Sequence, residues 1–174
     1  MIDTIVNPRL QRLYAYWCEK RGDRRFPARA DIDPLDLTFL LGNLILVDVV
    51  TGETPRFCIR LHGTNLAQRA GYELTGKMLD ELPISQFRQL ASETFAHVAS
   101  TGRPFRGNRD RVVDERTHRY ETVILPMSSD GECVDMLLIG LIYADEREPT
   151  RSWRRATTAD QVRSKSMRSV TGRP

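Results

Sequence analysis

The segment Ile84–Thr101, ISQFRQLASETFAHVAST, decides the fold. Its apolar residues recur at intervals of three and four, which predicts an amphipathic helix with one apolar stripe. Gly102 and Pro104 follow directly and end the helix. The stripe consists of Phe87, Leu90, Ala91, Phe95 and Val98. Such a helix needs an apolar surface to cover, so we expect a sheet built from the segments on either side of it.

Two strands are predicted before this helix and three after it. Leu44–Val50 and Arg56–His62 are rich in β-branched and apolar residues and flank a Gly/Pro turn, which predicts a hairpin. After the helix, the strand candidates are Phe105–Val113, His118–Met127 and Val134–Ala144. This order predicts an α+β fold, a five-stranded antiparallel sheet with helices on one face.

The last strand candidate is the most apolar. Met136–Ile142 carries apolar residues at odd and even positions alike, so both faces of this strand need cover. We therefore expect it at the centre of the sheet.

An additional helix is predicted at the N-terminus. Asn7 is a favourable N-cap, Pro8 suits the first helical position, and the helix extends to Lys20. A second, shorter helical segment is expected at Leu35–Leu41. We divide the chain into the N-terminal helix and connector (1–30), the sheet domain (31–145) and a tail (146–174).

Charge separates the tail from the rest of the chain. From residue 146 onward, eight Lys/Arg and three Asp/Glu give +5, while the preceding 18 basic and 20 acidic residues give −2. We expect the basic tail to be largely disordered, because it has almost no apolar pattern. A nearly neutral globular part does not predict a nucleic-acid-binding core.

Composition predicts a cytoplasmic protein. The chain has 174 residues, 40% hydrophobic and 28% charged, as in globular domains. The three cysteines, Cys18, Cys58 and Cys133, form no C-x-x-C pair, so we expect reduced thiols and no structural metal site. The apolar runs are too short to cross a bilayer, and no secretory signal is visible.

Several segments together resemble the PAS domain family. Gly63–Lys77, GTNLAQRAGYELTGK, is similar to the PAS segment that leads from the second strand into a short helix ending in Gly-Tyr. Pro126, Asp130-Gly131 and Leu137–Tyr143 resemble the last PAS hairpin. The likeness covers about residues 8–145. The opening blocks Leu13–Trp17, Arg24–Pro27 and Asp31–Leu35, with Arg60-Leu61, are similar to a single-domain PAS subfamily common in alphaproteobacteria. Asp114–Thr117 departs from the family, replacing its usual short D-G turn.

The resemblance implies a sensory or regulatory module in signal transduction. PAS domains hold a small molecule, or none, between the sheet and the helices, and no output domain is recognised on this chain. Lining residues are expected from the long helix and from the facing strands. The candidates are Ile59, Leu61, Phe87, Ala91, Phe95, Tyr120, Thr122, Leu137 and Ile139. A strand register shifted by one residue would exchange the inward and outward sets.

The resemblance also bears on the N-terminal helix, because PAS domains often pair through one. Its apolar stripe either covers the chain's own sheet or packs against a second copy in a dimer. Following the family, we favour a homodimer, with a further protein partner in signalling. The stripe consists of Leu10, Leu13, Tyr14 and Trp17.

Three histidines require an interpretation. His97 flanks the stripe of the long helix, where a PAS domain could use it as a haem ligand, but its edge position favours an exposed side chain. His62 and His118 are expected at the surface or rim of the sheet. Flavin-type photosensors carry a cysteine in the helical crossover, and Asn65–Leu82 has none. The sequence predicts neither haem nor flavin and requires no cofactor.

No catalytic motif is present, so we expect no enzyme. Two other functions remain as alternatives. One is a small α+β enzyme with His62, His97 or His118 as its base. The other is a nucleic-acid adaptor that binds through the basic tail.

Overall fold

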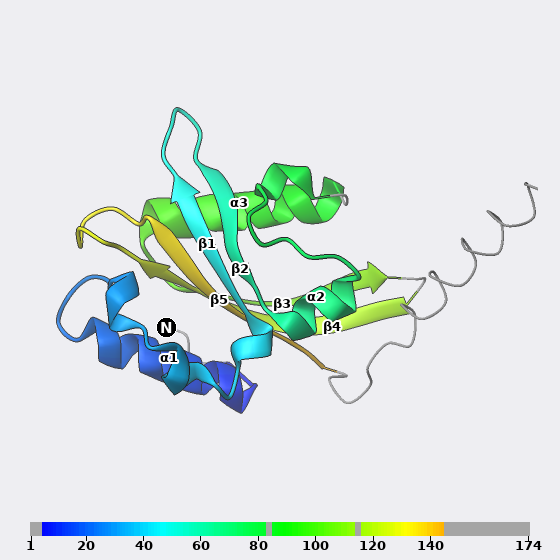
Figure 1. Ribbon diagram of the computed structural model, residues 1–174, viewed down its shortest axis with the longest axis horizontal. Coiled ribbons are helices and arrows are strands. Elements are labelled where there is room, and N and C mark those ends of the chain that lie inside the picture. Colours follow the sequence, from blue (N-terminus) through cyan, green and yellow to red (C-terminus); the bar gives the residue numbers. More distant parts are fainter. Residues whose placement is uncertain (1–4, 83–84, 114–115, 145–174) are drawn as a thin grey trace, which may run out of the picture.

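In the computed structural model, the chain forms a five-stranded antiparallel sheet between two helical layers (Figure 1). The structure describes residues 5–82, 85–113 and 116–144, with the backbone alone at 85–87, 111–113 and 116–118. α1 (Pro8–Arg21) packs on one face of the sheet, and α3 (Ser85–Thr101) packs on the other. The α+β fold is confirmed. The expected basic tail lies outside the described residues.

The strands follow the predicted order. The sheet order is β2-β1-β5-β4-β3, so the chain crosses from the first hairpin to the far edge through α2 (Thr64–Ala70) and α3. All eight positions of β5 are buried, and β5 is the central strand, as its two apolar faces predict. The strands span β1 (Leu44–Val50), β2 (Arg56–His62), β3 (Phe105–Val113), β4 (Arg116–Met127) and β5 (Met136–Tyr143).

The prediction of a helix at Leu35–Leu41 is wrong. Pro34–Leu37 and Leu41–Asn43 form two short 3₁₀ turns instead, and others lie at Arg29–Asp31 and Leu79–Glu81. Leu37 and Leu40 are both buried, and the N–H of Leu40 donates to the carbonyl oxygen of Leu37 (2.9 Å), three residues back rather than four as in an α-helix.

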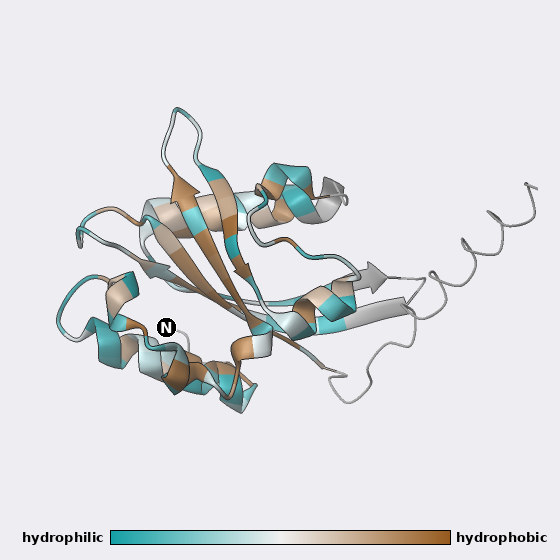
Figure 2. Ribbon diagram, viewed as in Figure 1, coloured by the Kyte–Doolittle hydropathy of each residue, from teal (hydrophilic) through white to brown (hydrophobic). Residues whose placement is uncertain are grey.

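α1 begins and ends where its capping residues predict. The Asn7 side chain accepts a hydrogen bond from the N–H of Arg9 (3.0 Å), and Pro8 occupies the first turn. Gly22, at φ 57°, ends the helix. Leu10, Leu13 and Trp17 are buried against β4 and β5, and hydrophobic and hydrophilic residues alternate along the α1 ribbon (Figure 2).

The burial of this stripe follows the first of its two alternatives, in which it covers the chain's own sheet. Leu10, Leu13 and Trp17 belong to the chain's own core, and Tyr14 is half-buried beside it. The physical reason is the apolar outer face of β5, which needs cover within the chain. A homodimer built on this stripe would have to pull α1 off the sheet.

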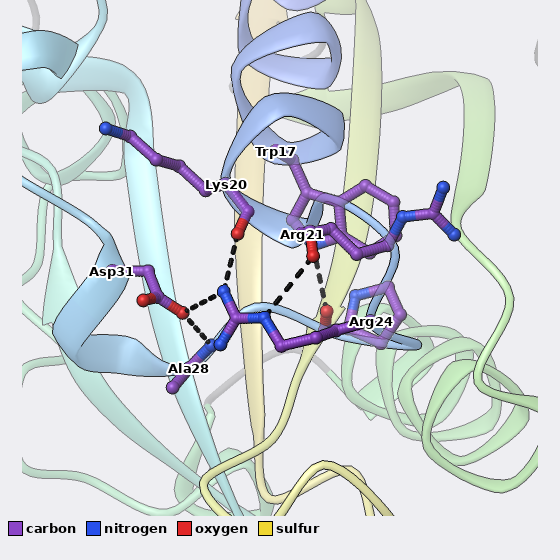
Figure 3. A network of polar contacts seen from close by, with 7 residues as sticks. Trp17, Lys20, Arg21, Arg24, Ala28 and Asp31 are labelled. Atoms are coloured by element: carbon purple, nitrogen blue, oxygen red, sulfur yellow. Dashed lines mark hydrogen bonds and ion pairs between the residues drawn. The ribbon is translucent and has the colours of Figure 1, made fainter.

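Arg24 fixes the C-terminal end of α1 to the connector (Figure 3). Its Nη2 donates to the carbonyl oxygen of Lys20 and to Oδ2 of Asp31, both at 2.7 Å, and its Nε donates to the carbonyl oxygen of Arg21 (3.3 Å). Asp31 also accepts from the N–H of Ala28 (2.7 Å). This backbone hydrogen bond, with Arg24, holds the pKa of Asp31 below its usual value. Two of the last carbonyls of α1 thus gain a side-chain partner.

α3 covers the opposite face of the sheet. Phe95 meets Phe57 of β2 edge-to-face, with ring centroids 5.5 Å apart, and Val98 is fully buried. Gly102, at φ 64°, ends α3 with its N–H bonded to the carbonyl oxygen of Val98 (2.9 Å). Among the described residues, no helix is long and apolar enough to cross a membrane.

A close approach between two backbones sets the corner where β2 leads into α2. The N–H of Gly63 donates to the carbonyl oxygen of Leu44 (2.8 Å), and Nδ2 of Asn65 donates to Oδ1 of Asn43 (2.9 Å). A Cβ at Gly63 would lie 2.4 Å from the carbonyl oxygen of Gly42 and 2.8 Å from that of Leu44. Both are backbone oxygens, so neither can move away from a Cβ without moving the chain.

Gly63→Ala is therefore expected to destabilise the fold. The added methyl group must separate two paired backbones, which we expect to lower the free energy of unfolding by about 1–3 kcal/mol. Urea denaturation measures the effect. Gly52→Ala is the control, because a Cβ there meets only the carbonyl oxygen of Thr54 at 3.5 Å. Equal midpoints for the two variants would contradict the close approach.

Candidate functional site

A cavity of about 60 Å³ lies between α3 and the sheet face that α3 covers, and it is partly open to solvent. Apolar side chains form most of its wall. Strands β1, β5, β4 and β3 are paired in this order, and each contributes side chains to the cavity wall. The lining residues are Ile45, Leu90, Ala91, Thr94, Phe95, Phe105, Arg109, Tyr120, Thr122, Ile124, Ile139 and Leu141.

The structure brings five of the predicted lining residues together here: Ala91, Phe95, Tyr120, Thr122 and Ile139. Two others, Ile59 and Leu137, are buried in the adjoining core but do not line the cavity. The side chain of Phe87 lies outside the described part of the chain.

Leu61 is misplaced by the prediction. It is 37% exposed, and His62, expected at the surface or rim, is buried. The pairing of β1 with β2 shifts register between Leu46 and Val47, so β2 carries one extra residue at Arg60. This β-bulge reverses the alternation beyond Ile59 and turns Leu61 outward.

Because of the bulge, we expect truncation of Ile59 and of Leu61, both on β2, to change the free energy of unfolding by different amounts. Ile59→Ala removes a buried side chain and should cost about 2–5 kcal/mol of unfolding free energy. Leu61→Ala removes an exposed side chain and should cost about 0.5 kcal/mol or less. Thermal or urea denaturation of the two variants checks this. If Leu61→Ala proved the costlier change, β2 would have an uninterrupted register.

Sequence reasoning missed several lining residues that the same periodicities could have found. Thr94 follows Leu90 and Ala91 at helical spacing and shares their face of α3. Phe105 and Arg109 lie four residues apart on β3 and therefore point to one face. Arg109 is paired with Tyr120 across β3 and β4.

The polar groups of the cavity are few. Oγ1 of Thr94 donates to the carbonyl oxygen of Leu90 (2.7 Å) and accepts from Nη2 of Arg109 (3.1 Å). Oγ1 of Thr122 donates to the carbonyl oxygen of Gly140 (3.1 Å). The arrangement suits a small, mostly apolar molecule held by a few polar contacts. Haem and flavins are larger than this cavity, so neither fits unless α3 moves.

The histidines do not converge on this cavity. His97 is exposed on α3 and does not line it, and the side chain of His118 lies outside the described residues. Nδ1 of His62 lies 3.5 Å from Oε1 of Glu73. Hydrogen bonds from the backbone N–H and the hydroxyl of Thr75 hold the pKa of Glu73 below its usual value. Within the described chain, no group of His, Cys, Asp and Glu is arranged to bind a metal.

A buried carboxylate lies on the opposite face of β4, between two cavity residues. Glu121, 9% exposed, follows Tyr120 and precedes Thr122. Its Oε1 accepts from the N–H of Val6 (2.9 Å), and its Oε2 accepts from the N–H of Asn7 (2.8 Å). Nε of Arg106 on β3 donates to Oε1 as well (3.1 Å). We call this group the Glu121 clamp, because it holds the chain at the start of α1 against the sheet.

Glu121→Gln is expected to loosen the clamp without changing the size of the side chain. The amide NH₂ faces a backbone N–H or the Arg106 guanidinium, and hydrogen bonds to charged groups contribute about 1.5–3 kcal/mol. We expect a loss of unfolding free energy in that range and faster hydrogen exchange at Val6 and Asn7. Glu93→Gln, at an exposed position on α3, is the control. Unchanged exchange at both amides would show that the clamp does not hold.

A family model for the PAS domain matches residues 5–142, most of the chain, including α1, β1 to β4 and β5 up to Ile142. The chain belongs to the PAS domain family. PAS domains are generally sensory signalling modules rather than enzymes, and the cavity lies between the sheet and α3 of such a module. The start of the match at Ile5 includes the clamped segment within the family's domain.

Several solved structures are similar to this PAS domain. The PAS domain of BvgS from Bordetella pertussis has a TM-score of 0.48 at 17% identity, covering 72% of this chain and 88% of that one. A Rhodobacter sphaeroides LOV protein gives 0.44 at 14%, with 59% and 58% covered. A fungal LOV domain photoreceptor gives 0.42 at 13%, with 82% and 98% covered. No curated protein matches the chain in sequence.

Proposed function

We propose that this PAS domain is a ligand-controlled regulatory module, in which occupancy of the cavity changes how firmly α1 is held on the sheet. The observation that carries this proposal is the alternation along β4. Tyr120 and Thr122 line the cavity, and Glu121 between them clamps the start of α1 on the other face. Successive residues of a strand point to opposite faces, so a displacement of one moves the other.

The size of the effect depends on differential binding. A ligand shifts the equilibrium between clamped and released α1 only by the difference in its affinity for the two states. A molecule that fills the cavity pushes on Tyr120 and Thr122, and β4 transmits this to Glu121. Because the clamp rests on three hydrogen bonds to one carboxylate, a small displacement lengthens all three together.

We further propose that the readout is a protein, either a second copy or another signalling protein, that distinguishes the two positions of α1. The exposed polar residues of α1, Gln11, Arg12 and Glu19, are accessible to such a partner. A cytoplasmic setting fits the cysteines, because Cys18, Cys58 and Cys133 are all free thiols.

A substitution that fills the cavity tests this coupling without a known ligand. In Ala91→Leu, the larger side chain occupies the space in front of Tyr120 and Thr122. We expect hydrogen exchange at the Val6 and Asn7 amides to accelerate at least about threefold, because weaker clamping raises the open population. NMR on the 174-residue chain measures this exchange.

Ser100→Leu serves as the matched control, since it adds a leucine to α3 at an exposed position away from the cavity. Ala91→Val is a smaller version for the case in which Ala91→Leu does not fold. Exchange at Val6 and Asn7 that stays unchanged, while the resonances of Ile139 and Thr122 shift, would refute the coupling.

A further inference from the structure

The cavity has one charged lining residue among those that the structure describes, Arg109 on β3. Its Nη2 donates to Thr94, and its guanidinium carbon lies 5.7 Å from the ring centroid of Phe105. In the described part of the chain, no carboxylate forms an ion pair with Arg109. A guanidinium carries five N–H donors, and the bond to Thr94 uses one of them.

The threonine hydroxyls in the cavity have already committed their hydrogen atoms. Thr94 donates to Leu90, and Thr122 donates to Gly140. Tyr120 also has an interaction partner. Arg109 is therefore the charged donor that the described lining offers a ligand, and a carboxylate is the acceptor that best matches a guanidinium.

The rest of the wall sets the shape of the ligand. At about 60 Å³ the cavity is smaller than one of roughly 150 Å³ that holds a benzene ring. Leu90 lines the cavity and is itself exposed, so it marks the open side. An unbranched chain can place its first few carbons in the cavity and the rest at this opening, whereas a ring needs its whole volume inside at once.

We infer that the ligand of this cavity is a short amphipathic anion, with an apolar chain against Ala91 and Ile139 and a carboxylate on Arg109. The inference deepens the proposed function and rests on it. It names the ligand class by charge and size, and it makes Arg109 the residue that selects a charged ligand over a neutral one.

Paired titrations of the 174-residue chain test the inference by NMR. The probes are hexanoate and hexanamide, which share one alkyl chain and differ in charge. We expect both to shift the resonances of Ala91 and Ile139, and hexanoate to bind at least about tenfold more tightly, as for one charge-assisted hydrogen-bonded contact. Arg109→Gln should remove this preference, and Arg109→Lys should retain part of it.

Arg56→Gln is the matched control, because Arg56 is an exposed arginine on β2 that pairs with Asp80 (2.9 Å). It should leave the preference intact. Equal affinities for the two probes, or a preference that survives Arg109→Gln, would overturn the inference and leave cavity binding standing. If neither probe moves Ala91 or Ile139, both the inference and a cavity open to small ligands fail. Should Arg109→Gln not fold, the comparison of the two probes on the unaltered chain still decides.

Discussion

The burial of β5 on both faces is the constraint on which the rest of the structure depends. A strand with eight buried positions needs an apolar layer above and below it. α3 provides one layer and α1 provides the other. For this reason α1 is part of the domain rather than an appendage, and its apolar stripe is used within the chain. Any signal that moves α1 must offset the cost of exposing Leu138 and Ile142.

β4 contributes side chains to both faces of the sheet, the one covered by α3 and the one covered by α1. Its side chains alternate between the cavity, at Tyr120 and Thr122, and the α1 face, at Glu121 and Val123. Among the described residues, the cavity wall carries the charge of Arg109, whereas the α1 face carries a buried carboxylate bound to backbone N–H groups. A single strand therefore contacts both the place where a ligand would enter and the segment whose position would change.

Periodicity predicted the fold and about half of the cavity wall, and its failures have physical causes. The helical stripe placed Ala91 and Phe95 correctly because α3 is regular over this stretch. On β2 the alternation failed at Leu61, since a bulge depends on cross-strand pairing that no local pattern records. The stripe of α1 was ambiguous for a different reason, because an apolar face has the same spacing whether it covers its own sheet or another molecule. Arg109 was missed because a charged residue was not expected in an apolar wall.

The second attachment of α1 gives the helix a fixed pivot. Nε1 of Trp17 donates to the carbonyl oxygen of Pro126 (2.9 Å), near the end of β4. Glu121, five residues before Pro126 on the same strand, accepts from the N–H of Asn7. Ten residues of helix span about 15 Å, and five residues of strand span about 17 Å. The two lengths match, so this part of α1 lies along β4 and is attached to it at both ends. Without the bonds to Glu121, the Trp17 end still holds α1, so any movement of the helix would be largest at its first turn.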